Sequence, residues 1–222
     1  MRIAVLGATG QIGSTIVNQL KADYPKATII ACSRRKLEGH FLFDPYQDNW
    51  TVLGELDVLV NCIGIIKETK SMSFHKAHVG LVEGILSKRE EMGNPKIIHI
   101  SANGASSESP YPYFNTKGQA EDMLNQEPNC HILKPSVVCI PDGEMVKQLR
   151  RARTLGYFFL NILPFPAKHL KVRLQPILVE ELAELVSELA TRDEGPKSLI
   201  AVGGEEITVR QLMKTLNPWF II

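Results

Sequence analysis

A glycine-rich turn between a buried strand and a helix constrains this chain more than any other feature. The apolar run Ile3-Ala4-Val5-Leu6 leads directly into Gly7-Ala8-Thr9-Gly10-Gln11-Ile12-Gly13, and a helical pattern follows. Glycine permits a sharp turn at Gly7, a close approach of the backbone to a pyrophosphate at Gly10, and packing of the helix on the strand at Gly13. Because amide groups at a helix start bind phosphate, this segment predicts a dinucleotide site. The cofactor residues that we expect here are Gly7, Thr9, Gly10, Gln11, Ile12 and Gly13.

Short runs rich in valine and isoleucine alternate with helical patterns along the first part of the chain. This alternation predicts β-α-β units, and near-continuous apolar runs predict strands covered on both faces. The fold class we expect is therefore α/β, a doubly wound and mostly parallel Rossmann sheet. The predicted strands are residues 2–6, 27–31, 41–43, 58–61, 96–101 and 130–134, and the predicted helices are 11–22, 47–54, 73–92 and 115–126.

The length of 222 residues suits one full domain and a modest addition. We predict a nucleotide-binding domain over residues 1–140 and a small C-terminal lobe over residues 141–222, which would hold a substrate or contact a partner. Within the lobe the patterns predict helices at 144–155, 180–190 and 209–216, strands at 170–175 and 198–202, and an apolar connection at 157–166.

The net charge of +1 gives no field that would gather nucleic acid, so we expect a small-molecule substrate or a protein partner instead. No segment has the length of a transmembrane helix, although basic side chains near 157–159 leave a peripheral membrane contact open. The four cysteines lack metal-ligand spacing, and the histidines are scattered, so no metal site is predicted. Free thiols and the absence of a leader pattern predict a cytoplasmic protein.

The end of the second predicted strand indicates which cofactor is preferred. Enzymes that use NAD place an acidic residue there to hold the ribose 2′-hydroxyl, whereas this chain has Ser33-Arg34-Arg35. A guanidinium suits a 2′-phosphate by its charge and its two-pronged geometry. We therefore predict NADP(H) in preference to NAD(H).

A tyrosine and a lysine follow the fifth predicted strand at helical spacing. Tyr113 and Lys117 are four residues apart, so both side chains can face one ligand. An adjacent cation favours the phenolate and would bring the pKa of the phenol into working range for acid and base catalysis. Ser101 closes the strand and is the expected hydrogen-bond donor to a substrate oxygen, while Asn103, Ser106 and Ser107 remain alternatives.

The ordered series of motifs resembles the atypical and extended short-chain dehydrogenase/reductases, in particular those similar to the NADPH-binding accessory subunit of respiratory complex I. The GxxGxxG spacing, Asn61-Cys62-Ile63-Gly64, the Tyr-x-x-x-Lys pair and the segment Ile132–Val138 carry the resemblance. It implies that tyrosine is the general acid or base and that lysine holds the nicotinamide ribose. It also assigns the following residues to the cofactor: Asp44 at the adenine, Cys62, Ile63 and Gly64 beneath the dinucleotide, and Pro135, Ser136 and Val138 after the sixth strand.

Three functions are consistent with these residues. The first is hydride transfer to or from a carbonyl or alcohol carbon, with Tyr113, Lys117 and Ser101 at the reacting centre. The second is a non-catalytic NADP(H)-binding module that serves as a structural subunit, assembly factor or redox sensor. The third is an epimerase or dehydratase that acts on a nucleotide sugar.

Overall fold

The computed structural model describes residues 1–140, 171–192 and 194–216, so the predicted helix at 144–155 and the connection at 157–166 lie outside the described residues. The chain divides into two compact units. The first contains Met1–Pro135 and Glu180–Ala201, and the second contains the described residues of Ser136–Val179 and Val202–Ile222.

The first unit is built on a seven-stranded sheet in the order β10-β6-β5-β4-β1-β2-β3, in which every neighbouring pair is parallel. This arrangement confirms the predicted α/β fold. Central strands carry side chains that are buried on both faces, as their continuous apolar sequences require. The strands are β1 (Arg2–Leu6), β2 (Thr28–Ser33), β3 (Phe41–Leu42), β4 (Val58–Asn61), β5 (Lys96–Ile100), β6 (Cys130–Pro135) and β10 (Ser198–Ala201).

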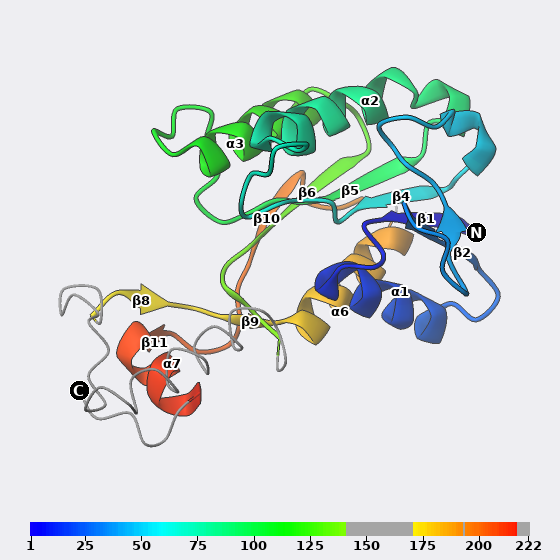
Figure 1. Cartoon of the computed structure of the whole chain (residues 1–222). Helices are drawn as coiled ribbons and strands as arrows, with labels where there is room; N and C mark the ends of the chain where they lie inside the picture. Colours follow the sequence, from blue (N-terminus) through cyan, green and yellow to red (C-terminus); the bar gives the residue numbers. More distant parts are fainter. Residues whose placement is uncertain (141–170, 193, 217–222) are drawn as a thin grey trace. The chain divides into compact units, whose positions relative to one another are not determined.

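Helices cover both faces of this sheet (Figure 1). One face carries α1 (Gln11–Asp23) and α6 (Val179–Thr191), and the other carries α2 (Leu81–Ser87) and α3 (Pro112–Asn125). The hydroxyl of Tyr24, just after α1, donates to the Ser187 carbonyl of α6 at 2.9 Å. This contact ties the two helices of the first face together.

The predicted long helix at 73–92 is divided in the structure. A single π-helical turn at Lys76–Gly80 leads into α2, and a 3₁₀ turn follows at Glu90–Met92. Gly93 then takes a left-handed conformation with a φ of 79°, which reverses the chain before β5. Single π-helical turns are frequent at functional sites, and this one carries His78. The predicted helix at 47–54 is a short 3₁₀ helix, Trp50–Leu53.

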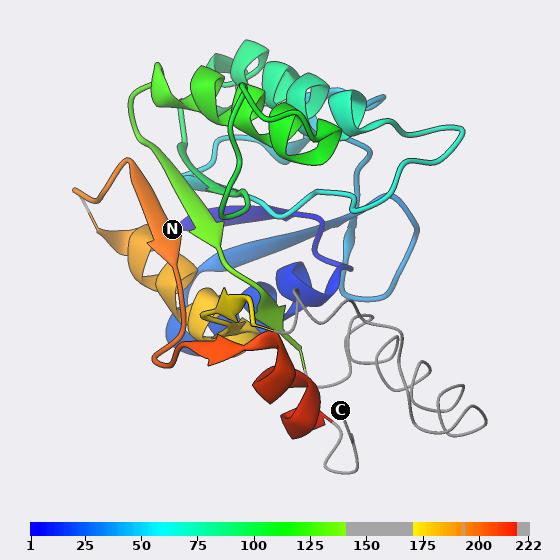
Figure 2. The same ribbon diagram turned by 90° about the vertical axis from the view of Figure 1, so that its left-hand side faces the viewer.

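The structure divides the chain differently from the predicted ranges of 1–140 and 141–222. Residues 180–201 belong to the first unit, because β10 pairs with β6 from Ser198 opposite Ile132 to Ala201 opposite Pro135. Figure 2 shows these two strands side by side. The chain therefore returns to complete the sheet after it has passed through the second unit.

Within its described residues, the second unit contains two short strand pairs and one helix. β7 (Val138–Cys139) pairs in parallel with β9 (Ile177–Leu178), and β8 (Arg173–Leu174) pairs in antiparallel fashion with β11 (Ile207–Thr208). The helix α7 (Val209–Leu216) follows β11 directly.

Candidate functional site

The glycine turn has the geometry that its sequence predicts. β1 ends at Leu6, Gly7 has a φ of 76°, and the Gly10 amide donates to the Gly7 carbonyl at 2.9 Å. A Cβ on Gly13 would lie 2.2 Å from the Gly7 carbonyl oxygen, so only glycine allows α1 to start this close to the turn. No side chain caps the start of α1, and its first turn contains no acidic residue. The helix start is therefore suited to receive an anion.

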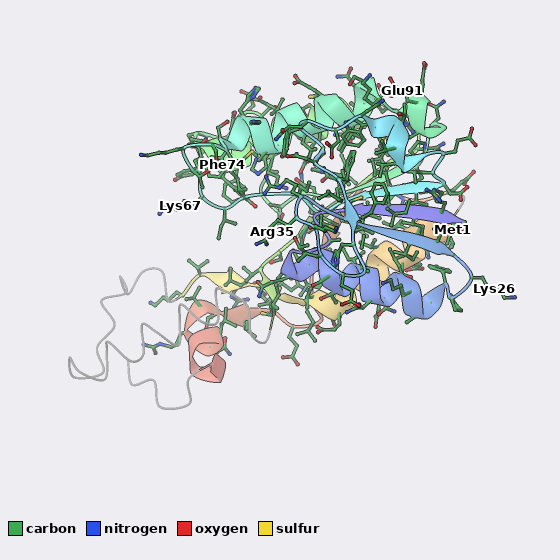
Figure 3. All side chains as sticks on the ribbon, turned by 45° about the vertical axis from the view of Figure 1, so that its right-hand side comes forward. Met1, Lys26, Arg35, Lys67, Phe74 and Glu91 are labelled. Atoms are coloured by element: carbon green, nitrogen blue, oxygen red, sulfur yellow. The ribbon has the colours of Figure 1, made fainter. Side chains whose placement is uncertain are left out.

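A cavity of about 260 Å³ lies along this turn, at the carboxyl ends of β1, β2 and β4. This is the edge where ligands bind in open α/β sheets. Figure 3 shows the labelled Arg35, Lys67 and Phe74 on the side of the first unit opposite to Met1 and Lys26. Eight of the predicted cofactor residues line the cavity: Gly7, Thr9, Gly10, Ser33, Arg34, Cys62, Ile63 and Gly64.

Other predicted residues do not contribute to the described lining of this cavity. Gln11, Ile12 and Gly13 lie in the first turn of α1, and Arg35 is exposed after β2, where its amide donates to the Ser33 hydroxyl at 3.1 Å. Pro135 ends β6, whereas Ser136 and Val138 belong to the second unit. Ser101, Asp44, Tyr113 and Lys117 also lie outside the lining.

Asp44 closes a turn instead of facing the cavity. Its carboxylate accepts hydrogen bonds from the Tyr46 amide and from the Gln47 side chain, both at 3.0 Å. These bonds hold Pro45 and Tyr46 against the cavity, where both residues contribute to the lining. The adenine contact of Asp44 stays a prediction. Aspartate side chains often bond to the backbone two residues ahead, as this one does.

Lys117 is a buried cation directly behind the cavity wall. Its Nζ donates to the Ile100 carbonyl at 2.9 Å and lies 3.3 Å from the point where a Cβ on Gly64 would stand. Burial lowers the pKa of Lys117 to about 8, although the Glu121 carboxylate opposes this effect. The absence of a side chain at Gly64 thus leaves the ammonium next to the backbone that lines the cavity.

Tyr113 lies in a cluster of aromatic rings on the same helix face as Lys117. Its ring meets those of Phe74, His78 and Phe114 edge-on, with centroid distances of 5.7, 5.5 and 5.1 Å. Burial raises the pKa of the Tyr113 phenol. We expected the neighbouring lysine to lower this pKa, and the structure differs because desolvation is the dominant influence on the phenol. The tyrosine is consequently held in its protonated form.

Ser101 does not present its hydroxyl to the cavity. The hydroxyl donates to the Glu121 carboxylate at 2.5 Å, and the other oxygen of that carboxylate accepts from Lys134 Nζ at 2.7 Å. Serine, glutamate and lysine form a partly buried chain that joins β5, α3 and β6. The expected role of Ser101 as a donor to substrate is replaced here by a structural bond. Of the alternatives, the Ser106 hydroxyl accepts from the Glu108 amide, and Asn103 is exposed.

The sequence predicts ordinary packed or surface histidines at His78 and His99, and both side chains are buried in the structure. His78 Nδ1 lies 2.8 Å from the Thr116 hydroxyl, and His99 Nδ1 accepts from the Asn61 amide at 3.0 Å. In both rings Nε2 is buried without a hydrogen-bond partner among the described residues. Burial lowers the pKa of His78 to about 4 and that of His99 well below its usual value, and the Lys117 charge adds to both effects. His99 interrupts the apolar strand β5, which is the signal that could have found it, whereas His78 lies in a helical turn and gives no such signal.

No family model matches the chain. It is 28% identical over 151 residues to the mitochondrial protein FMP52 of Meyerozyma guilliermondii, a match that covers 62% of this chain and 65% of that protein. It is also 28% identical over 150 residues to the mitochondrial NADH dehydrogenase [ubiquinone] 1 alpha subcomplex subunit 9 of Arabidopsis thaliana, which covers 60% of this chain. The matched region spans only 37% of that subunit.

Among solved structures, MoeE5 in complex with UDP-glucose and NAD matches with a TM-score of 0.77 and 17% identity, over 98% of this chain and 82% of that one. The sequence matches confirm the resemblance to the atypical short-chain dehydrogenase/reductases related to complex I subunits, and the structural match confirms the Rossmann fold.

The expected cytoplasmic location is contradicted by these comparisons, because every curated relative that matches is named as a mitochondrial protein. The expectation depended on unpaired cysteines and on the first residues of the chain, and neither feature identifies a compartment. No helix in the described ranges is long and apolar enough to cross a membrane. Within the same residues, no cluster of three histidine, cysteine or acidic side chains could hold a metal ion.

Proposed function

We propose that this protein binds NADP(H) in the cavity along the glycine turn and transfers hydride between the nicotinamide and a carbonyl or alcohol carbon. The observation that carries the proposal is a single cavity that joins the uncapped start of α1 to the Arg34 side chain. A helix start and a guanidinium are the two groups that a phosphorylated dinucleotide requires. The comparisons support a nicotinamide dinucleotide as the ligand, since one relative is a subunit of an NADH dehydrogenase and one neighbour was solved with NAD, whereas the choice of NADP(H) depends on Arg34.

The residues of the cavity fit such a cofactor. Gly7 and Gly10 bring the backbone to the position of the pyrophosphate, and a Cβ on Gly10 would already meet the Gly7 carbonyl oxygen at 3.2 Å. Arg34 in the cavity lining offers a positive charge for the 2′-phosphate. Gly64 leaves the Lys117 ammonium directly behind the cavity wall, and we assign this ammonium to the ribose hydroxyls.

The chain's own contribution to the reaction is the control of protons. The nicotinamide supplies or accepts the hydride when it is bound. Tyr113 then acts as the acid in the direction of reduction, because burial keeps its phenol protonated and able to donate to a carbonyl oxygen. Lys117 stays charged at neutral pH and favours negative charge that develops near it. We therefore assign to Tyr113 the role of proton donor when a carbonyl is reduced.

Replacement of Tyr113 by Phe tests the catalytic part of the proposal. Phenylalanine retains the ring contacts to Phe74, His78 and Phe114 but removes the proton donor. We expect the rate of NADPH oxidation with a panel of carbonyl compounds to fall by roughly 100-fold or more. The Kd for NADPH should stay within about twofold of the wild-type value, because the ring keeps its packing contacts. Unchanged turnover in Tyr113→Phe would contradict the assigned role.

A second candidate function is a non-catalytic NADP(H)-binding subunit. Two observations favour it: Ser101 is turned toward Glu121, and relatives are named as complex I subunits. In this case the dinucleotide stabilises the fold by linkage without turnover. Tight NADPH binding by the wild-type protein, combined with no turnover of any carbonyl compound in the panel, would favour this candidate over the enzyme.

A further inference from the structure

One corner of the cavity contains a buried phenol that the fold does not explain. β2 and β3 pair in parallel with Ser33 opposite Leu42, so the residues that follow these strands emerge next to each other. Arg34 follows β2, and Pro45 and Tyr46 follow β3 shortly afterwards. All three residues line the cavity. We call this part of the wall the Arg34 corner.

The hydroxyl of Tyr46 is buried and has no hydrogen-bond partner among the described residues. The Tyr46 ring packs against the hydrophobic core, so the hydroxyl cannot turn out into water without loss of that contact. Other polar groups of the same turn are satisfied, since the Asp44 carboxylate accepts from the Tyr46 amide and from Gln47. A buried hydroxyl without a partner is unfavourable, and native proteins retain such groups rarely and usually for a reason.

Two cations lie near the Tyr46 side chain. The Arg34 guanidinium lies in the same wall of the cavity, and Lys76 Nζ lies 5.5 Å from the centroid of the Tyr46 ring. Both carboxylates of the turn are bonded, since that of Asp44 accepts two hydrogen bonds and that of Asp48 accepts from the Asp44 amide. Burial raises the pKa of Tyr46 to about 12, so the phenol remains a donor at all physiological pH values. A neutral O–H donor beside two cations is complementary to an anion with free acceptor oxygens.

We propose that Tyr46 is a specificity-determining residue, whose hydroxyl donates to the 2′-phosphate of the adenosine half of NADP(H) together with the Arg34 guanidinium. This inference rests on the proposed function and adds to it a residue that recognises the phosphate by a hydrogen bond. A bond from the phenol to a phosphate oxygen is assisted by the charge of the phosphate, whereas a bond to the neutral 2′-hydroxyl of NAD(H) is not. Tyr46 therefore contributes to the preference for the phosphorylated cofactor, and Lys76 adds to the local positive charge.

The substitution Tyr46→Phe in the full chain tests this role by isothermal titration calorimetry. We expect the Kd for NADPH to rise about tenfold, as for the loss of one charge-assisted hydrogen bond. The Kd for NADH should change less than about twofold. Adenosine 2′,5′-bisphosphate and adenosine 5′-monophosphate serve as smaller probes, and only the bisphosphate should lose affinity. Because the lost hydroxyl has no partner, the melting temperature of the unliganded variant should not fall.

Tyr24→Phe is the matched control, since the Tyr24 hydroxyl donates to the Ser187 carbonyl at 2.9 Å. This variant should melt at a lower temperature and bind all four ligands as the wild type does. Equal loss of NADPH and NADH affinity in Tyr46→Phe, or no loss of either, would overturn the inference and leave the proposed function intact. If the wild-type protein binds neither NADPH nor the bisphosphate, the proposed function fails and this inference fails with it.

Discussion

Gly13→Ala is expected to lower the free energy of unfolding by on the order of 3 kcal/mol and to abolish measurable binding of NADPH. The added Cβ would stand 2.2 Å from the Gly7 carbonyl oxygen and 2.8 Å from the Gly7 carbonyl carbon. Both atoms belong to the backbone of the turn, so no side-chain rotation can relieve the overlap. The helix α1 must move away from the turn, and its amides then lose their position relative to the cavity. Urea denaturation and calorimetric titration measure the two effects.

Gly84→Ala provides the matched control within a helix. Gly84 lies in α2, and no heavy atom stands within 4 Å of the place that its Cβ would occupy. Alanine should therefore stabilise the protein by roughly 0.5–1 kcal/mol, because it is the better helix former. If Gly13→Ala unfolds at the same urea concentration as Gly84→Ala, the close packing of α1 on the glycine turn is wrong.

Lys117→Met is expected to raise the free energy of unfolding near pH 7 and to weaken the binding of NADPH. The pKa of Lys117 is about 8 in the folded protein and 10.5 for an ordinary lysine, so the folded state holds this proton less tightly than the unfolded state. One unit of pKa difference corresponds to about 1.4 kcal/mol. The charged lysine therefore lowers the free energy of unfolding by on the order of 3 kcal/mol below pH 8. Between pH 8 and 10.5 the wild-type stability should rise, because only the unfolded chain still binds the proton.

Methionine removes this cost but leaves the Ile100 carbonyl without the ammonium that donates to it. The loss of that hydrogen bond offsets about 1 kcal/mol of the gain. We therefore expect the free energy of unfolding to rise by roughly 2 kcal/mol at pH 7. The rise in stability between pH 8 and 10.5 should disappear in the variant. Urea denaturation across this pH range measures both effects, and a gain in stability with a loss of ligand affinity is typical of functional residues.

Lys134→Met separates this effect from the general effect of removing a lysine. Lys134 Nζ is 2.7 Å from the Glu121 carboxylate, and both side chains are largely buried. Its loss removes the direct ion-pair partner of a buried carboxylate, and we expect a destabilisation of about 2 kcal/mol or more. Should Lys117→Met and Lys134→Met both destabilise the protein at pH 7, the account of Lys117 as an unfavourably buried charge would be incorrect.

Much of the fold follows from patterns that are local in the sequence. The ranges predicted for β1 and β4 agree with the structure residue for residue, because each strand is a short apolar run with a clear break at its end. The return of β10 to the first unit was not predicted. In its pairing with β6, Ser198 lies opposite Ile132, which is far away in the sequence. The residues of the short strand Ser198–Ala201 do not indicate which strand they pair with.

The parts of the candidate site that the backbone forms could be predicted from the sequence. The parts that side chains form were harder to predict. Gly7, Gly10 and Gly64 line the cavity as predicted, since their roles depend on the absence of a side chain at a given position in the turn. Ser101 could not be placed, because its rotamer is decided by Glu121, which lies twenty residues later. Tyr46 was missed because a lone tyrosine after an Asp-Pro pair gives no sign that its hydroxyl will be buried without a partner.

Thermal stabilisation by NADPH compared with NADH tests the central claim most directly. A ligand that binds only the folded protein raises the free energy of unfolding by about 2.7 kcal/mol at ~100 times its Kd, so melting temperatures report relative affinity. With Arg34 in the cavity wall, we predict that both dinucleotides raise the melting temperature and that NADPH raises it more at equal concentration. A larger shift with NADH, or no shift with either dinucleotide, would contradict the account.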